Sequence, residues 1–202
     1  MNAPIEDLRK SRNRIPPPSA KLFCSLIYSG HFVLQAAIEA LVQEWGGVET
    51  ISRRLPFDFT PYYEKEMGSA LVRKFLVFRD PVEQDSLPAL KGTANRVESH
   101  FLGPGGARKV NIDPGLLLAD KLVLATTKPS ANRPYLGSGV YADLSLVYHR
   151  GSYRSLPWTY PDYAGRETIE MMNALRNRFL EKRRRGLGET DPRQRNSPEG
   201  MP

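Results

Sequence analysis

Apolar residues along the chain form either continuous runs or repeats at helical spacing. These two patterns predict strands and helices, respectively. Residues 21–29, KLFCSLIYS, form a continuous apolar run, which is typical of a strand buried on both faces. The next apolar residues recur at helical spacing: Leu34, Ile38, Leu41 and Trp45. We therefore expect a helix that the Ser29 side chain caps and that Gly46-Gly47 ends.

Two further strands, a second helix and a fourth strand follow the same reasoning. Residues 48–57 and 70–78 are rich in β-branched and aromatic residues, which favours strands. The second helix is expected to open at Asp85 or Ser86 and to end at the GPGG sequence of residues 103–106. Its apolar stripe consists of Leu87, Leu90, Ala94, Val97 and Phe101. Residues 107–112, ARKVNI, predict the fourth strand.

The order βαββαβ is that of ferredoxin-like sandwiches, in which two helices cover one face of a mostly antiparallel sheet. Residues 121–127 and 141–149 predict additional strands, and a turn at residues 150–152 leads into a short edge strand. The sequence thus predicts an α/β (α+β) fold, a ferredoxin-like βαββαβ sandwich extended by a C-terminal β-hairpin and a final helix over residues 166–185. A doubly wound parallel sheet would need more helices between its strands.

Length and composition indicate one domain with two tails. The 202 residues include 40% hydrophobic and 25% charged residues, which suits a single core. The terminal stretches hold many prolines and charges and few residues to bury, so they cannot offset the entropy of ordering. We expect disordered tails at residues 1–19 and 186–202 around a single domain at residues 20–185.

The net charge of +7 lies mostly at the chain ends. Residues 1–20 and 182–202 supply +2 and +3, which leaves +2 for the body of the chain. A nucleic-acid surface would concentrate cations on the folded body. We therefore expect nucleic acid to bind, at most, weakly through the basic tails.

The chain carries no sign of a membrane or secretory address. No apolar run approaches the ~18 residues that span a bilayer, and no apolar segment of a secretory signal precedes the first strand. The single cysteine, Cys24, lies inside an apolar strand and is expected to be a buried thiol. These features predict a cytoplasmic protein without membrane contact, and they leave the oligomeric state open.

The motifs of several common sites are missing. The sequence has neither GxxxxGK[ST] nor GxGxxG, and it has no GxSxG for a serine nucleophile. The histidines, His31, His100 and His149, have no partner at metal-ligand spacing. Classical nucleotide-binding folds and zinc are therefore disfavoured.

The stretch FDFTPYYEKEMG, residues 57–68, is the first of three candidate clusters. A helical turn here would place Tyr62 and Glu66 four residues apart on one face, with Tyr63 beside them. Aromatic rings with carboxylates, among them Asp58 and Glu64, suit a sugar, a base or an amine. The alternative is a turn whose tyrosines only cover the edge of the sheet.

The sequence NIDPG, residues 111–115, is the second cluster. Pro114 and Gly115 suit the central positions of a type II turn, and Asp113 is held extended before the proline. This carboxylate suits a base or a ligand of a divalent metal ion. It equally suits an aspartate that accepts N–H bonds in its own turn.

The third cluster, ATTKPSANR, follows an apolar strand. Thr127, Lys128 and Arg133 supply the hydroxyl, ammonium and guanidinium groups that bind phosphate or carboxylate. A solvated loop has a similar composition, so the ligand-binding role is one of two alternatives.

Several of these stretches together resemble a family of uncharacterised prokaryotic proteins, domain of unknown function family 4416. The similarity covers roughly residues 21–163 and includes KLFCSLIYS, PFDFTPYYEKEMG, RKVNIDPG, KLVLATTK, RPYLGSGVYADLSL and PWTYPDY. The resemblance implies no reaction, because the family has none established. Some relatives look to be labelled GTP-binding, but this sequence has no phosphate loop and no N-K-x-D motif. It also departs from the family pattern at Leu116, Asn132 and Asp143.

Our leading hypothesis is that the three clusters meet at one rim of the sheet and bind a small anionic or nucleotide-like ligand. Asp113 with Glu64 or Asp58 would supply acid/base or metal carboxylates if the protein is a hydrolase or transferase. Lys128 and Arg133 would hold the anion beside Tyr62 and Tyr63, with Glu66 and Thr127 as further ligand contacts. The rival is a non-catalytic module that binds RNA or a protein partner.

Overall fold

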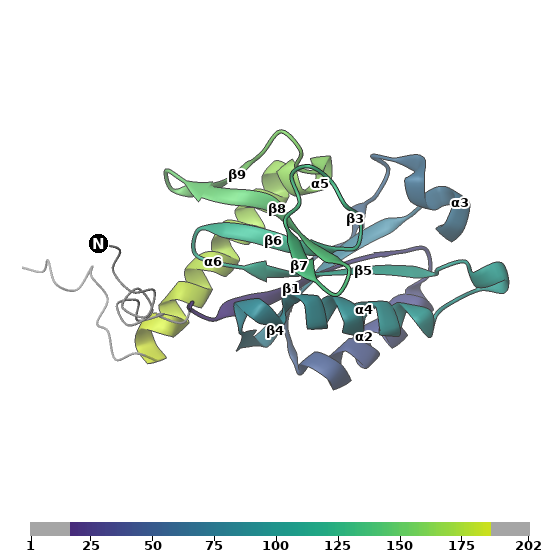
Figure 1. Cartoon of the computed structure of the whole chain (residues 1–202), viewed down its shortest axis with the longest axis horizontal. Helices are drawn as coiled ribbons and strands as arrows, with labels where there is room; N and C mark the ends of the chain where they lie inside the picture. Colours follow the sequence, from purple (N-terminus) through teal and green to yellow (C-terminus); the bar gives the residue numbers. More distant parts are fainter. Residues whose placement is uncertain (1–16, 187–202) are drawn as a thin grey trace, which may run out of the picture.

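The computed structural model describes residues 17–186, which form a mixed α/β fold around one large antiparallel sheet (Figure 1). Seven of its strands lie side by side in the order β2 (Val48–Ile51), β4 (Val72–Val82), β1 (Ala20–Tyr28), β5 (Val110–Leu117), β6 (Lys121–Thr126), β8 (Val140–His149) and β7 (Tyr135–Gly137). The remaining strands are β3 (Leu55–Pro56), which pairs with β4, and β9 (Ser152–Ser155), which pairs with β8.

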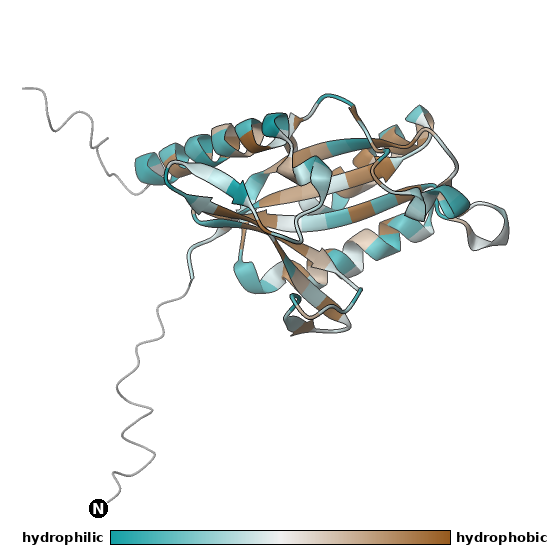
Figure 2. Cartoon of the chain, turned by 90° about the horizontal axis from the view of Figure 1, so that it is seen from above, coloured by the Kyte–Doolittle hydropathy of each residue, from teal (hydrophilic) through white to brown (hydrophobic). Residues whose placement is uncertain are grey.

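Two helical layers cover the sheet because its central strands are apolar on both faces. On one face Leu22, Leu26 and other residues of β1 pack against α2 (His31–Trp45) and α4 (Leu87–Ser99). On the other face Phe23 packs in a cluster with residues of α5 (Pro161–Ala164) and α6 (Arg166–Gly186). Figure 2 shows hydrophobic residues along the strands and a mostly hydrophilic outer surface on α6. Within residues 17–186 no helix combines the length and apolar character needed to cross a bilayer.

The predicted strand at residues 48–57 is interrupted. It forms the two short strands β2 and β3, both paired with β4. Ser52 lies between them, and its hydroxyl accepts a hydrogen bond from the Phe75 N–H at 2.9 Å. A side chain thus replaces the backbone carbonyl at this point of the ladder, which ends regular pairing.

The predicted cap of the first helix is wrong. Gly30, not Ser29, is the N-cap residue of α2, and no side chain caps this end. Ser29 lies one residue too early to reach the free N–H groups of the first turn. The predicted end is confirmed, because Gly46 follows α2 with a φ of 83°.

The predicted turn at Pro114-Gly115 is also wrong, because both residues lie inside β5. Pro114 is paired with Cys24 of β1, and pairing with β6 begins only at Gly115. Proline has no N–H to donate, so it ends the pairing between β5 and β6 and leaves the first half of β5 without a strand neighbour on that side. Tertiary pairing with β1 overrides the local turn preference.

In the C-terminal half, the predicted strands at residues 121–127 and 141–149, the short edge strand and the final helix are confirmed as β6, β8, β9 and α6. The short elements β7 and α5 were not predicted. The hairpin of β8 and β9 turns at Arg150 and Gly151, whose φ angles are 48° and 86°. Of the predicted tails, the structure describes only residues 17–19, which have no regular secondary structure, and Gly186, where α6 ends. The rest of both predicted tails lies outside the described residues.

Candidate functional site

A cavity of about 470 Å³ opens beside the unpaired first half of β5. Its walls come from segments far apart in the chain: residues 57–63, one side of α4, residues 108–113, the end of β6 and residues 160–163. Because no strand is paired with this side of β5, side chains from both helical layers reach the cavity.

Helix α4 takes the place of a strand neighbour at this edge. The Ile112 N–H donates to Glu98 Oε1 at 2.6 Å, and the Ile112 carbonyl accepts from Lys91 Nζ at 2.8 Å. Lys91 and Glu98 are two helical turns apart on the same face of α4, so they can flank one residue of β5. Pro114, two residues further along β5, faces the same side with its nitrogen. No backbone group at Ile112 is therefore left without a partner.

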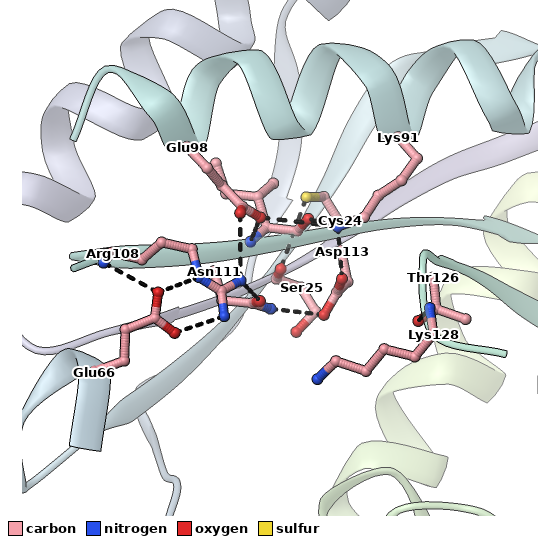
Figure 3. A network of polar contacts seen from close by, with 11 residues as sticks. Cys24, Ser25, Glu66, Lys91, Glu98, Arg108, Asn111, Asp113, Thr126 and Lys128 are labelled. Carbon is pink, nitrogen blue, oxygen red and sulfur yellow. Dashed lines mark hydrogen bonds and ion pairs between the residues drawn. The ribbon is translucent and has the colours of Figure 1, made fainter. Parts of the chain in front are cut away.

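Lys91 also holds the carboxylate of Asp113. Its ammonium lies 2.9 Å from Asp113 Oδ1, and Asn111 Nδ2 donates to Asp113 Oδ2 at 2.7 Å (Figure 3). Burial alone would raise the pKa of Asp113, but the Lys91 charge and these hydrogen bonds outweigh it and hold the pKa below its ordinary value. Asp113 is thus an ionised, neutralised carboxylate and a weak base near neutral pH.

Glu98, like Asp162, is a carboxyl group of this cavity whose pKa shifts in the opposite direction to that of Asp113. Its side chain is buried, 3.8 Å from Lys91 Nζ and 3.5 Å from Arg108 Nη1. Burial raises its pKa above the ordinary value, although Lys91 and Arg108 offset part of this effect. Among the described residues that line the cavity, Glu98 is therefore a candidate for proton transfer.

Arg108 connects the first cluster to the sheet. Its Nε and Nη2 donate to the two oxygens of Glu66, each at 2.7 Å, and its Nη1 donates to Asn111 Oδ1 at 2.9 Å. The hydrogen bonds from Arg108 lower the pKa of Glu66. This bidentate pair fixes α3 (Glu64–Met67) and the preceding turn η1 (Pro61–Tyr63) against β5. Glu66 therefore supports the segment that carries Tyr62 and Tyr63, but does not itself line the cavity.

Tyr62 and Tyr63 form an aromatic wall of the cavity, and the ammonium of Lys128 lies against this wall. The rings of Tyr62 and Tyr63 meet edge to face at 4.9 Å between centroids. Lys128 Nζ lies 3.9 Å from the centroid of Tyr62 and 5.4 Å from that of Tyr63. Across residues 17–186 no carboxylate forms an ion pair with Lys128, whose ammonium in Figure 3 extends toward the polar network. Lys128 thus brings an uncompensated positive charge to the mouth of the cavity.

Arg133 has a different role from Lys128. Its guanidinium is 2.7 Å from Asp143 Oδ2 and donates to the Lys128 carbonyl at 3.1 Å. Both side chains of the ion pair are buried or nearly so. Arg133 therefore fixes the loop that presents Lys128, and its own charge is already compensated.

A second buried pair closes the inner end of the cavity. Arg73 Nε lies 2.7 Å from Asp162 Oδ2, and Arg73 Nη1 donates to the Ser25 hydroxyl at 3.0 Å. The Arg73 guanidinium also lies 4.9 Å from the Phe57 centroid and 5.0 Å from the Tyr163 centroid. Aromatic rings surround the guanidinium, and the Asp162 carboxylate neutralises its charge. This pair therefore adds no net charge to the inner end of the cavity.

The structure brings most of the predicted site residues together. Those that line the cavity are Tyr62, Tyr63, Asp113, Thr127, Lys128 and Arg133. Asp58 and Glu64 are exposed and do not line it, because the turn that directs the tyrosines inward directs these carboxylates to solvent.

Sequence reasoning missed the polar residues that complete the cavity: Arg73, Lys91, Glu98, Arg108 and Asp162. Lys91 and Glu98 left a signal, because with Ala94 they fall on one face of α4 at spacings of three and four residues. Charges on the apolar face of a predicted helix indicate a buried polar partner. Arg73 gave no such signal within its strand.

In residues 17–186 no group of three or more histidine, cysteine, aspartate or glutamate side chains is placed to hold a metal ion. At Asp113 the position of a cation is taken by the Lys91 ammonium.

Comparison with known proteins places the chain in a family. A sequence profile described as Domain of unknown function (DUF4416) matches residues 18–179. The chain belongs to this family. No curated protein and no solved structure matches it. The DUF4416 match runs from the start of β1 into α6 and so contains every segment that lines the cavity.

Proposed function

We propose that this DUF4416 protein binds a small anionic ligand, of nucleotide or sugar phosphate size, in the cavity beside β5. The observation that carries the proposal is the ammonium of Lys128, which has no carboxylate partner among residues 17–186 and rests on the ring of Tyr62. By contrast, the other four cations that line the cavity have carboxylate partners: Arg73, Lys91, Arg108 and Arg133. A ligand anion is the missing partner of Lys128.

The size and lining of the cavity support this proposal. Ligand sites typically occupy roughly 300–1,000 Å³ and combine apolar walls with a few polar groups, and the cavity of about 470 Å³ lies in this range. Exposed rings stand at its mouth, since Phe59, Tyr62 and Tyr160 are 50%, 59% and 47% exposed. Rings in this position suit stacking against a flat ligand group.

A hydrolase or transferase activity would require proton transfer inside the cavity. Asp58 and Glu64 are outside it, and Asp113 is held ionised by Lys91. Glu98 suits this role better, because it lines the cavity and its pKa is raised by burial. We therefore propose ligand binding by Lys128 as the function of the cavity. Proton transfer by Glu98 would be added to it if the protein is an enzyme.

The rival function, an RNA-binding or partner-binding module, has less support. RNA-binding sheets stack bases on aromatic residues of an open face. Here both faces of β4 are covered, with Phe75 packed in one core cluster and Phe78 in the other. The basic residues after position 186 lie outside the described part of the chain.

We also propose that the protein has a ferredoxin-like core and that it is cytoplasmic. The strand order β2-β4-β1-β5, with α2 and α4 as connections on one face, supports a ferredoxin-like core to which β6 to β9 and α6 are added. A buried free cysteine, Cys24, is in keeping with a reducing compartment.

A thermal-shift screen tests the proposed function. Nucleotides, sugar phosphates and dicarboxylates are added to the wild type and to Lys128→Met, with Lys65→Met as the matched control because Lys65 is an exposed lysine of α3 outside the cavity. We expect at least one anion to raise the melting temperature of the wild type and of Lys65→Met, but not of Lys128→Met. An absence of any shift in the wild type, or an equal shift in Lys128→Met, contradicts the proposal.

A further inference from the structure

Asp113 has the most accessible carboxylate among the described residues that line the cavity. Its side chain is 27% exposed, whereas the side chains of Glu98, Asp143 and Asp162 are 8%, 7% and 4% exposed. Figure 3 shows the Asp113 carboxylate on the side of β5 that faces Lys128. The carboxylate makes up most of an aspartate side chain, so a ligand inside the cavity can contact it.

This carboxylate can accept more hydrogen bonds than the protein supplies. Within residues 17–186 it accepts one hydrogen bond at each oxygen, from Lys91 Nζ at 2.9 Å and from Asn111 Nδ2 at 2.7 Å. An ionised carboxylate offers about four acceptor positions. Because the pKa of Asp113 is held below its ordinary value, the group has no proton to donate near neutral pH. A ligand group that contacts Asp113 must therefore be a hydrogen-bond donor.

The charges around Asp113 indicate that this donor is neutral. The Lys91 ammonium already neutralises the carboxylate, and the positive charge of Arg73 acts on the same carboxylate and helps to lower its pKa. An ammonium group of a ligand would be repelled by both cations. A hydroxyl group donates a hydrogen bond without adding charge. Since Asp113 is a weak base, it is suited to hold a hydroxyl group rather than to remove its proton.

We propose that Asp113 accepts a hydrogen bond from a hydroxyl group of the ligand whose anionic group is bound by Lys128. This inference rests on the proposed function and deepens it, because it names the ligand class: phosphorylated or carboxylated compounds that carry hydroxyl groups. Lys128 and Asp113 form no ion pair with each other within residues 17–186, so a ligand can lie between them. Sugar phosphates and the ribose of nucleotides both present such hydroxyl groups.

The first experiment compares ligands on the wild type. A panel of pentose phosphates, hexose phosphates and nucleoside monophosphates carries hydroxyl groups, whereas propyl phosphate and phenyl phosphate carry none. Dissociation constants are measured by titration calorimetry. We expect at least one panel member to bind roughly 10- to 100-fold more tightly than both hydroxyl-free phosphates, because its hydroxyl donates to a charged acceptor.

Analogues of the panel member that binds most tightly then identify the hydroxyl group. Each hydroxyl is replaced in turn by hydrogen or by fluorine. Loss of the hydroxyl that contacts Asp113 should weaken binding roughly 10- to 100-fold. Fluorine should not restore the affinity, because it cannot donate a hydrogen bond to a carboxylate. The position of this hydroxyl, on a nucleotide ribose or on a free sugar phosphate, distinguishes the two sources.

Asp113→Asn tests the protein side of the same contact. The amide has a similar shape but is a neutral, weaker acceptor, so the preference for hydroxyl over hydrogen should fall below ~3-fold. Asp58→Asn is the matched control at an exposed position outside the cavity and should keep the full preference. Circular dichroism checks that Asp113→Asn is folded at the titration temperature. If it is not folded, the comparison of hydroxyl, hydrogen and fluorine on the wild type still decides the proposal.

Three results would overturn the role of Asp113. The hydroxyl-free phosphates could bind the wild type as tightly as every panel member, fluorine could restore the affinity that hydrogen loses, or folded Asp113→Asn could keep the wild-type preference. In each case phosphate binding would still depend on Lys128. Failure of the proposed function is different, because then no probe binds the wild type, or every probe binds Lys128→Met as well as the wild type.

Discussion

At the residue scale, Lys91 links the fold to the site. Its ammonium satisfies the Ile112 carbonyl at the open edge of β5 and also neutralises Asp113. A buried ammonium is costly unless it is paired and hydrogen-bonded, and here three groups share it, because Glu98 lies 3.8 Å away. The same contacts keep Asp113 ionised, so the cavity is lined at this point by the positive charge of Lys91 and the negative charge of Asp113.

This pairing predicts how stability depends on pH. The folded pKa of Asp113 is lower than its ordinary value of 3.8, so the unfolded chain binds a proton more readily at this position. The stabilisation is fully present above the unfolded pKa and is lost as the pH falls through the folded pKa. We expect Asp113→Asn to lower the free energy of unfolding by ~2 kcal/mol at pH 7.

Urea unfolding from pH 7 down to pH 3 measures this difference. It should shrink as the pH falls below about 4, because the wild-type carboxyl group becomes protonated. Asp58→Asn, at an exposed position outside the cavity, is the control and should change stability by less than ~0.5 kcal/mol at pH 7. A difference between wild type and Asp113→Asn that grows toward low pH would be inconsistent with an ionised, stabilised Asp113.

At the element scale, the close approach of β5 to β6 just after Pro114 shapes the cavity. A Cβ on Gly115 would lie 2.7 Å from Leu124 Cδ2 and 2.8 Å from the Val123 carbonyl oxygen. The glycine therefore lets the two strands meet on one side of Pro114, while the proline keeps them apart on the other. The cavity occupies the space that remains.

Two glycine variants test this arrangement. Gly115→Ala should lower the free energy of unfolding by ~2–4 kcal/mol, because the new methyl group meets backbone that cannot move without breaking the pairing. Gly92→Ala is the opposite case, since Gly92 lies in α4 with no atom within 4 Å of an added Cβ. It should raise stability by up to ~1 kcal/mol. Denaturant unfolding of both variants provides the measurement, and a neutral Gly115→Ala would show that the strands are not in close contact.

The elements also show which features of the fold could be predicted from sequence. The buried run of β1 and the apolar stripes of α2 and α4 have strong periods, so their type and position were predicted well. The local preference of the Pro114-Gly115 pair predicts a turn, whereas its extended conformation depends on pairing with Cys24 and Phe23. The ion-pair partners Glu66 of Arg108 and Asp162 of Arg73 lie on distant segments, and no local pattern could indicate them.

At the scale of the whole molecule, the sheet brings the three sequence clusters to one place. Tyr62, Asp113 and Lys128 come from segments separated by more than ten residues each, and all three line one cavity. They meet there because β1 lies between β4 and β5, which places the turn before β4 near the first half of β5 and the end of β6. A candidate site could thus be inferred from sequence, although its buried ion pairs could not.

The central claim is that Lys128 and the aromatic wall hold the anionic group of a ligand inside this cavity. A crystal structure of the protein with the nucleotide or sugar phosphate that raises its melting temperature most tests this claim directly. We expect the anionic group within ~2.7–3.2 Å of Lys128 Nζ, with the ligand body beside Tyr62 and inside the cavity. A ligand bound outside the cavity, or an anion held by other cations while Lys128 remains without a partner, would contradict the account.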